Sequence, residues 1–264
     1  MSKIEVYDRP GRYLNQVELD SLIADLRSVA SECLDELPDY QCLSGHRKEF
    51  ERLIISVSRS KEGKMLGFCS SYILDAGEHG QVLHLGLTCV LPLARRMGLT
   101  HKLTSKVLTT YLFRYSLFKE SWVSNVACVL SSLGNVALHF DDVYPSPYLA
   151  SPSVDHQAIA KMINEKYRWE LYIRDEAKFD ERKFIFEESV LGNQFQKSEQ
   201  DKRYHHRSKK MTEFYANMMN FERGDEVLQI GKVSLLTFPR YLLKNLKKRW
   251  IKDAQLAPAS QSIA

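Results

Sequence analysis

Several features that assign a chain to a particular class are missing from this sequence. It has only 5 cysteines in 264 residues, and no two of them form a C-x-x-C pair, so the usual clue to a structural zinc site is absent. The cysteines are odd in number and lie mostly in apolar surroundings, which predicts reduced thiols in the core. They are Cys33, Cys42, Cys69, Cys89 and Cys128. We therefore expect no metal site.

Long apolar stretches and an excess of one charge are also missing. No apolar run approaches the roughly 18–20 residues that a helix needs to cross a bilayer. The first ten residues include acidic side chains and lack the apolar segment of a secretory signal. We expect a cytoplasmic protein with no transmembrane segment. The 37 basic and 33 acidic residues give a net charge of +4, too mild to predict a specific nucleic-acid partner.

Four common catalytic motifs are absent as well. The chain has no G-x-x-x-x-G-K-[ST], G-x-G-x-x-G, H-E-x-x-H or G-x-S-x-G. Their absence argues against a P-loop enzyme, a dinucleotide oxidoreductase, a zincin and a standard α/β-hydrolase. What is present is the composition of a globular protein, 44% hydrophobic and 27% charged. The length suits one full core with an extension.

The first half of the chain predicts an alternation of strands and helices. A helix is expected after Asn15, which can act as its N-cap, with Glu18 at the capping-box position and apolar residues at three- and four-residue steps. A hairpin turn is expected at 61–64. The other elements are strands at 4–7, 50–57, 65–74, 81–91 and 122–130, and a helix from Leu99.

The stretch from His84 to Leu103 organises this half. An apolar, β-branched run ends at Pro92, a compact turn carries Arg95, and an amphipathic helical pattern follows. A helix start offers N–H groups without intrahelical partners, and its dipole favours negative charge by about 0.3–1 kcal/mol. Strand, loop and helix together predict a phosphate site, with an ordinary turn bearing solvated arginines as the alternative.

The residues of this turn resemble the acetyl-CoA-binding signature of the GCN5-related N-acetyltransferase (GNAT) superfamily. That signature is Q/R-x-x-G-x-G/A after a strand ending in V-x-P, and here Val90-Leu91-Pro92 is followed by Arg95, Gly98 and Thr100 at the three motif positions. Thr100 departs from the usual small residue. The resemblance implies a mixed α/β, GNAT-like fold, whose mostly antiparallel sheet has two splayed strands and is flanked by helices.

The resemblance also implies a coenzyme site with acetyl-CoA or another acyl-CoA as co-substrate. Backbone groups of Cys89, Val90 and Leu91 would bind the pantetheine arm between the splayed strands. Asn135 would also hold this arm, with a helix N-cap as its alternative role. The loop residues would wrap the pyrophosphate. They are Arg95, Arg96, Met97, Gly98, Leu99 and Thr100.

Acyl transfer from a thioester to an amine needs a proton acceptor and a proton donor, but no enzyme nucleophile. His84 is the candidate base, because its reference pKa is near 6.5; its alternative is a hydrogen-bonded core residue. Tyr144 is the candidate acid by resemblance, two residues later than the family spacing. Cys89 can take the acyl group or serve as a packing residue. Three other bases are alternatives by position: Glu78, His79 and His139.

Residues 151–264 are expected to form a C-terminal α+β extension packed on an acyl-CoA-binding core of residues 1–150. Ser153 is expected to cap a helix. Residues 201–210, with five Lys or Arg and two His, predict a solvated loop. A basic amphipathic helix at 240–252 suits either peripheral contact with an anionic membrane or docking on its own domain. Further strands are expected at 169–173, 183–186 and 226–236.

Two functions from different classes follow. The resemblance implies an N-acyltransferase that moves acetyl from acetyl-CoA to a small-molecule or peptide amine by direct attack in a ternary complex. The extension would cover the acceptor site or form a homodimer contact. The rival is a non-catalytic module of the same fold that binds an anionic membrane or RNA through 202–210 and 240–252. Salt weakens such electrostatic binding steeply, which separates the two.

Overall fold

The computed structural model describes residues 3–95, 97–117 and 119–235. The strands in this part of the chain are β1 (Lys3–Asp8), β2 (Leu53–Arg59), β3 (Met65–Asp75), β4 (Gln81–Val90), β5 (Ser121–Ala127), β6 (Asp141–Tyr144), β7 (Lys178–Asp180), β8 (Ile185–Glu187) and β9 (Glu226–Val233). The helices are α1 (Gln16–Ser31), α2 (Arg47–Phe50), α3 (Leu99–Tyr115), α4 (Leu130–His139), α5 (Val154–Lys166) and α6 (Lys209–Ala216). The predicted helix at 240–252 lies outside the described residues.

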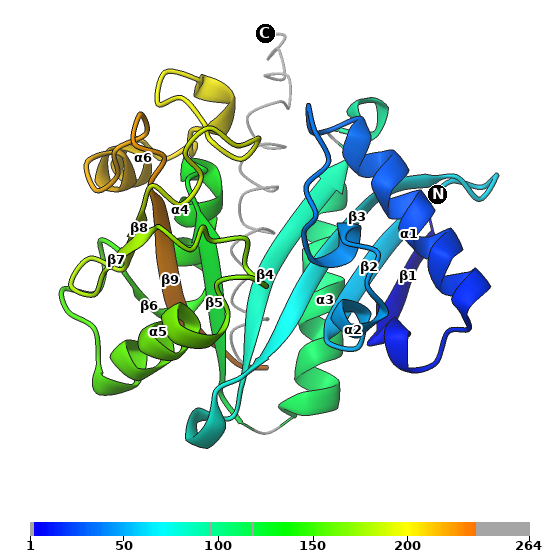
Figure 1. Cartoon of the computed structure of the whole chain (residues 1–264), viewed down its shortest axis with the longest axis horizontal. Helices are drawn as coiled ribbons and strands as arrows, with labels where there is room; N and C mark the ends of the chain where they lie inside the picture. The colour runs from blue at the N-terminus through cyan, green and yellow to red at the C-terminus, as the bar shows by residue number, and fades with distance from the viewer. Residues whose placement is uncertain (1–2, 96, 118, 236–264) are drawn as a thin grey trace, which may run out of the picture.

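The nine described strands form one sheet with helices on both faces (Figure 1). The strands lie in the order β1-β2-β3-β4-β5-β9-β8-β7, and β6 also pairs with β9. Every pairing is antiparallel except that of β4 with β5. The predicted fold class, mixed α/β with a mostly antiparallel sheet, is confirmed. The order of long elements from β1 to β5 is the one that the resemblance implies.

The first long helix begins where the sequence predicts. Asn15 Oδ1 accepts from the Glu18 N–H at 2.9 Å, and Glu18 Oε2 accepts from the Asn15 N–H at 3.0 Å. This capping box satisfies two groups that a helix start leaves without partners. The buried side of α1, with Leu19, Leu22 and Leu26, packs on the sheet from the face opposite to α3 (Figure 1).

Strand β9, from the second half of the chain, completes the central sheet. It pairs with β5 along the whole of that strand, from Ala127 opposite Val227 to Ser121 opposite Val233. Behind this pair, Asn125 Nδ2 donates to Gln229 Oε1 at 3.1 Å. The two halves of the chain therefore share one sheet and one buried hydrogen-bond network.

Two predicted strands of the second half are wrong in whole or in part. Residues 169–173 form hydrogen-bonded turns that close on the end of α5, with Tyr172 at φ +59°. Of residues 183–186, only the last two belong to a strand, because Phe184 has a φ of +56° in the preceding turn. Apolar content alone does not distinguish such turns from strands.

The predicted solvated loop at 201–210 is also wrong in part, because α6 begins inside it at Lys209. Lys209 forms an ion pair with Glu213 at 3.3 Å, and Met211 and Tyr215 are buried one helical turn apart. The charged residues before and at the start of α6 favour a loop, so the sequence pattern did not indicate the short apolar side of this helix. Of the helices in the described residues, none has the length and apolarity that crossing a bilayer requires.

Candidate functional site

Strands β4 and β5 part after a short common stretch. They pair only from Val82 opposite Trp122 to His84 opposite Ser124. Beyond this point β4 continues beside β3 alone and β5 beside β9 alone, and the register of β3 with β4 shifts between Cys69 and Ser71. The two strands therefore form a fork that is closed at His84 and open toward Val90, as the predicted splay requires.

A cavity of about 480 Å³ fills this fork. Its strand walls are 85–88 on β4 and 125–127 on β5. One side is formed by α3 and α4, through Thr100, Thr104, Ser131, Ser132 and Asn135. The opposite side is formed by loops before α2 and after α5 and β8, and by the start of β9, through Tyr40, Tyr172, Phe195, Lys197 and Glu226. The cavity thus passes through the sheet and opens toward both faces.

The loop between β4 and α3 lies at the open end of the fork. A short 3-10 turn at Pro92–Ala94 uses the N–H groups of Ala94, Arg95 and Met97 internally, at 2.9, 3.3 and 3.4 Å. Gly98 then takes a left-handed conformation, with φ +69°, and caps α3. The first donor inside this helix is Lys102, so the N–H groups of Leu99 and Thr100 have no helical acceptor. Of the predicted anion-binding loop, the residues with N–H groups available to an anion are therefore those at Gly98–Thr100, and Arg95 lies on the same loop.

The structure brings together only some of the residues predicted to bind coenzyme. Thr100 and Asn135 line the fork cavity, and Arg95, Met97, Gly98 and Leu99 belong to the loop. Arg96 lies outside the described residues. The residues of β4 that line the cavity are 85–88. Sequence reasoning missed them, because the point where two strands separate depends on partners far away in the chain.

Cys89, Val90 and Leu91 lie just beyond the cavity wall. Cys89 and Leu91 are buried, and the Leu91 N–H donates to Leu66 O on the β3 side at 3.0 Å. Because successive residues of a strand direct their backbone groups to opposite edges, Val90 directs its N–H away from β3, while its carbonyl oxygen accepts from Cys33 Sγ. The role of these three residues in binding stays a prediction.

The alternative role of Asn135 as a helix N-cap is wrong. Helix α4 begins at Leu130, and its N-cap is Val129, so Asn135 lies in the middle of the helix. The predicted strand at 122–130 is correspondingly too long, because β5 ends at Ala127. Asn135 can therefore offer its amide to an occupant of the cavity.

His84, the candidate base, lies at the closed end of the fork. It is 1% exposed, and its Nδ1 shares a hydrogen bond of 3.1 Å with Ser124 Oγ. Burial lowers the pKa of His84 to about 3, so the imidazole is neutral near pH 7. The residues around it match the structural alternative, while the catalytic role stays a prediction. Of the other candidates by position, His139 lines the cavity, whereas His79 lies 3.6 Å from Asp155 Oδ1.

Tyr144, the candidate acid, lies away from His84. Its Oη donates to Arg182 O at 2.6 Å, and its ring packs edge-on against Phe184 at 4.9 Å between centroids. It lines a second hollow, formed by the following loop and α6, instead of the fork cavity. The structure does not bring these two predicted catalytic residues together, and an acid role for Tyr144 stays a prediction.

Two cysteines meet beside the loop. Cys33 Sγ donates to Val90 O at 3.4 Å. A hydrogen bond from the Cys89 thiol, together with the Arg95 guanidinium, lowers the pKa of Cys33 to about 6, and the same contact raises the pKa of Cys89. The raised pKa and the burial of the Cys89 thiol favour its packing role over acyl transfer.

Sequence reasoning missed Glu226, the first residue of β9. It is 7% exposed, lines the fork cavity, and accepts a 2.6 Å hydrogen bond from Ser189 Oγ. Burial raises the pKa of Glu226 to about 7. A single glutamate at the start of a strand carries no motif, and Ser189 lies 37 residues before it.

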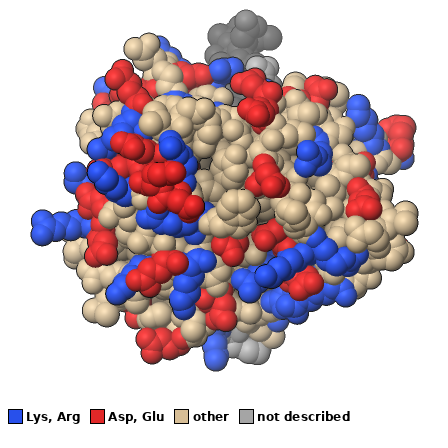
Figure 2. All heavy atoms as spheres, in the orientation of Figure 1, with Lys and Arg blue, Asp and Glu red and all other residues tan. Residues whose placement is uncertain are grey.

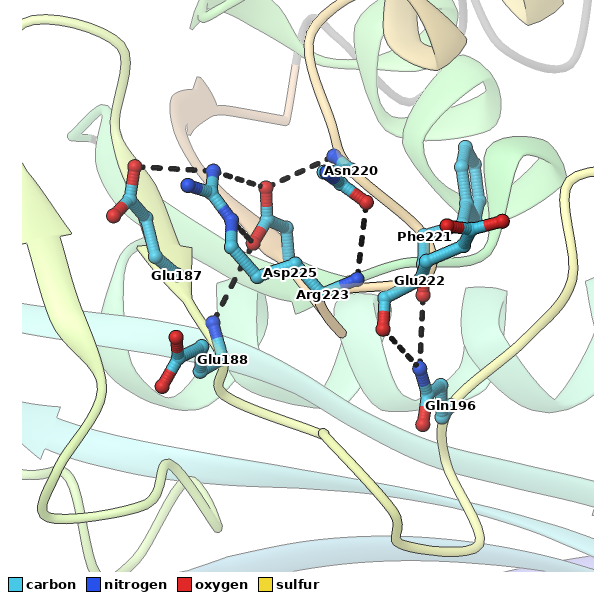
Figure 3. A network of polar contacts seen from close by, with 8 residues as sticks. All are labelled: Glu187, Glu188, Gln196, Asn220, Phe221, Glu222, Arg223 and Asp225. Atoms are coloured by element: carbon cyan, nitrogen blue, oxygen red, sulfur yellow. Dashed lines mark hydrogen bonds and ion pairs between the residues drawn. The ribbon is translucent and has the colours of Figure 1, made fainter.

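A polar network fixes the backbone just before Glu226 (Figure 3). Asp225 accepts from the N–H groups of Asn220 and Glu188, and Arg223 bridges Asp225 and Glu187. Gln196 ties the neighbouring loop to this turn, donating to Phe221 O at 2.9 Å and to Glu222 O at 3.2 Å. The start of β9 is thereby held against the loop that carries Phe195 and Lys197.

In the described part of the chain, no group of three or more His, Cys, Asp and Glu side chains is arranged to hold a metal ion. The polar groups of the cavity are hydroxyls, amides, two histidines, one lysine and one carboxylate. Such groups suit hydrogen bonding and proton transfer.

No protein-family model matches this chain, and no curated protein is significantly similar to it. Solved structures give partial matches. An aminoglycoside acetyltransferase from an uncultured soil metagenomic sample is 15% identical with a TM-score of 0.32, over 43% of this chain and 74% of its own. A predicted acetyltransferase with acetyl-CoA from Clostridium acetobutylicum is 13% identical with a TM-score of 0.39, over 56% and 96%. Escherichia coli ElaA is 16% identical with a TM-score of 0.36, over 55% and 93%.

Proposed function

We propose that this chain is an acyl-CoA-dependent N-acyltransferase with acetyl-CoA as donor and a primary amine as acceptor. One observation carries the proposal: the fork between β4 and β5 holds a cavity that runs from the N-terminus of α3 through to the other face of the sheet. A donor with a charged diphosphate and a long arm fits the first part, and an acceptor can approach from the second. The solved acetyltransferases to which part of the chain is similar agree with this class of reaction.

The loop supports binding of the diphosphate. The N–H groups of Leu99 and Thr100 at the start of α3 and the helix dipole favour an anion, and Arg95 is exposed on the loop before them. The left-handed Gly98 leaves open space where a side chain would project. We propose that the residues from Arg95 to Thr100 contact the diphosphate.

The fork supports binding of the pantetheine arm. Beyond His84 the edge of β4 that faces β5 has no ladder partner, so its backbone groups can pair with the amides of the arm. Asn135 and Thr100 line the same side of the cavity. The thioester would then lie near the middle of the fork, where both faces of the sheet are accessible.

The main contribution of the protein to this reaction is to hold the amine next to the thioester carbon. An amine that has lost its proton attacks the thioester carbon, and the thiolate leaves. No residue has to be acylated, which agrees with the protonated, buried state of Cys89. For His84 we propose that its bond to Ser124 holds the two strands together where the fork begins.

The rival reading, a module that binds anionic surfaces, has less support in the described residues. In the predicted basic segment, Arg203 pairs with Asp201 and Lys209 pairs with Glu213. On the face in Figure 2, Lys and Arg are interspersed with Asp and Glu around a largely uncharged centre. Neither the predicted basic segment nor the face in Figure 2 is a continuous positively charged surface.

A thermal-shift titration tests the proposed function against its rival. We expect acetyl-CoA to raise the melting temperature, and thiol release to follow when an amine is added. Anionic vesicles and RNA, each at two salt concentrations, are the comparison, because electrostatic binding falls steeply with salt. Stabilisation by vesicles or RNA without any by acetyl-CoA would favour the non-catalytic module.

A further inference from the structure

Three aromatic rings gather at one end of the cavity, where Tyr40 and Tyr172 come from the loops before α2 and after α5. Tyr40, Tyr172 and Phe195 lie 5.5–5.9 Å apart between ring centroids, each pair edge-on. Gln41 connects the loops that carry two of them, because its Nε2 donates to Glu170 O at 3.0 Å. Three segments distant in the sequence thus form one aromatic wall.

Glu226 points to the same side of the sheet as this wall. Along β9, Val227 and Gln229 face α4 and α6, because Gln229 donates to Leu133 O and Tyr215 Oη. Side chains alternate along a strand, so Glu226 faces the opposite side, with Leu228. Burial raises the pKa of Tyr40, and the charges of Cys42 and Glu226 add to that rise.

We propose that this end of the cavity is the acceptor subsite, that it binds a primary amine with one positive charge and an apolar body, and that Glu226 takes the proton from that amine. The inference rests on the proposed function, because it assigns the acceptor of the same reaction. A site for polycationic acceptors would need several carboxylates in its walls, whereas this subsite needs one.

The charges around the cavity support a single ammonium group. Among the described residues that line it, Glu226 is the one carboxylate. Lys197 adds a positive charge at the margin, where its Nζ donates to Gln194 O at 2.7 Å. A second ammonium group on the acceptor would meet Lys197 and apolar walls without a partner, which is costly to bury.

The remaining walls support an apolar body. Leu171 lines the cavity and belongs to the same core cluster as Leu228, on the face toward which Glu226 points. A cation near ring faces is stabilised by the negative face of the ring, and an apolar chain gains from leaving water. Arylalkyl and alkyl monoamines combine both properties.

The proton and electron balance is simple. The bound R–NH₃⁺ gives one proton to the Glu226 carboxylate, and the nitrogen lone pair then attacks the thioester carbon. The C–N bond forms, the C–S bond breaks, and the thiolate leaves with the bonding pair. A second proton passes from the nitrogen to the thiolate, so the products are an amide, free thiol and one proton released from Glu226.

The surroundings of Glu226 set its titration. Burial raises its pKa to about 7, while the bond from Ser189 opposes that rise. Tyr40, Cys128 and Lys197 are the other titratable groups near this end; burial raises the pKa of Tyr40 and of Cys128. A bound ammonium group favours the ionised carboxylate. Glu226 is thus a base with a pKa near the operating pH, as acid–base catalysis requires.

The test uses the full chain, two amines and two variants. Calorimetry measures binding of 2-phenylethylamine and of spermidine without coenzyme, and thiol release with acetyl-CoA measures turnover of each. Glu226→Gln keeps the size of the side chain and removes its charge. Glu222→Gln is the matched control, because Glu222 is exposed four residues earlier.

We expect 2-phenylethylamine to bind and to be acetylated in preference to spermidine. Glu226→Gln should weaken amine binding and lower turnover by about 10²–10⁴-fold, with the rise of rate with pH removed and stabilisation by acetyl-CoA unchanged. Glu222→Gln should behave as wild type. Preference for spermidine, no turnover of either amine while acetyl-CoA binds, or full activity of Glu226→Gln would each overturn the inference. Failure of acetyl-CoA to bind would instead reject the proposed function.

Discussion

At the scale of single residues, the fork depends on a buried imidazole. His84 and Ser124 face each other at the last paired position of β4 and β5, and their hydrogen bond is removed from water. A neutral histidine there satisfies the serine without adding a charge to the core. A protonated one would place an unpaired charge among apolar side chains, which is strongly unfavourable.

Acid should therefore destabilise the protein through His84. The folded pKa is about 3 and the unfolded value near 6.5, so the unfolded chain binds more protons between these limits and stability falls as pH falls. We expect His84 to cost about 2 kcal/mol of unfolding free energy between pH 6.5 and pH 5, at about 1.4 kcal/mol per unit. Urea unfolding at both pH values measures it. His84→Gln, which keeps a polar partner for Ser124, should lose this part of the pH dependence; an unchanged dependence would contradict the buried, neutral state.

Residues whose partners are near in sequence were predictable. The capping box joins Asn15 and Glu18 three residues apart, and α3 begins at Leu99, as its amphipathic pattern predicts. Glu226 was not predictable, because its role depends on Ser189, Tyr40 and a cavity formed by segments far apart in the sequence. A long-range site of this kind has no signature in local spacing.

At the scale of elements, β5 and α4 decide what the fork can hold. The strand ends three residues earlier than its apolar pattern predicts, and the helix that follows brings Ser131, Ser132 and Asn135 to the cavity. The apolar run 126–130 continues across this change of element, so hydrophobicity gave no sign of it. The pairing of β5 with β9 ends at Ala127, where the chain turns into the helix.

Filling the fork from α4 should block the donor. Ser132→Trp adds an indole on the cavity side of a half-exposed helix position, so we expect loss of coenzyme A binding with little change in melting temperature. Ser28→Trp is the matched control, because Ser28 is exposed on α1, away from the cavity. Calorimetry with coenzyme A measures both variants. Undiminished binding by Ser132→Trp would show that the donor does not use this cavity.

At the scale of the whole molecule, the second half of the chain completes the first. Without β9, the edge of β5 would be exposed and Asn125 would lose Gln229 as its buried partner. Sequence patterns predicted a core of residues 1–150 with an extension packed on it, because hydrophobic periodicity identifies strands but not which strands pair. The sheet runs without interruption from one part into the other, and the division at residue 150 stays a prediction.

A fragment of residues 1–150 should therefore fail to fold on its own. We expect the fragment to show no cooperative thermal transition. We also expect it to associate through the uncovered edge of β5. Circular dichroism and size-exclusion chromatography measure both. A monomeric fragment that melts cooperatively would show instead that the predicted core is an independent domain.

The central claim is that the N-terminus of α3 holds the diphosphate of a coenzyme whose arm enters the fork. Its most direct test is calorimetry of coenzyme A binding to wild type, Gly98→Asp and Gly98→Asn. Both side chains are similar in size and tolerate the left-handed backbone at Gly98 better than most, so charge is the main difference between them. Like charges in close contact cost several kcal/mol, and each 1.4 kcal/mol is tenfold in affinity. We expect Gly98→Asn to bind coenzyme A and Gly98→Asp to bind it at least about 100-fold more weakly at equal melting temperature; equal affinity of the two variants would contradict the account.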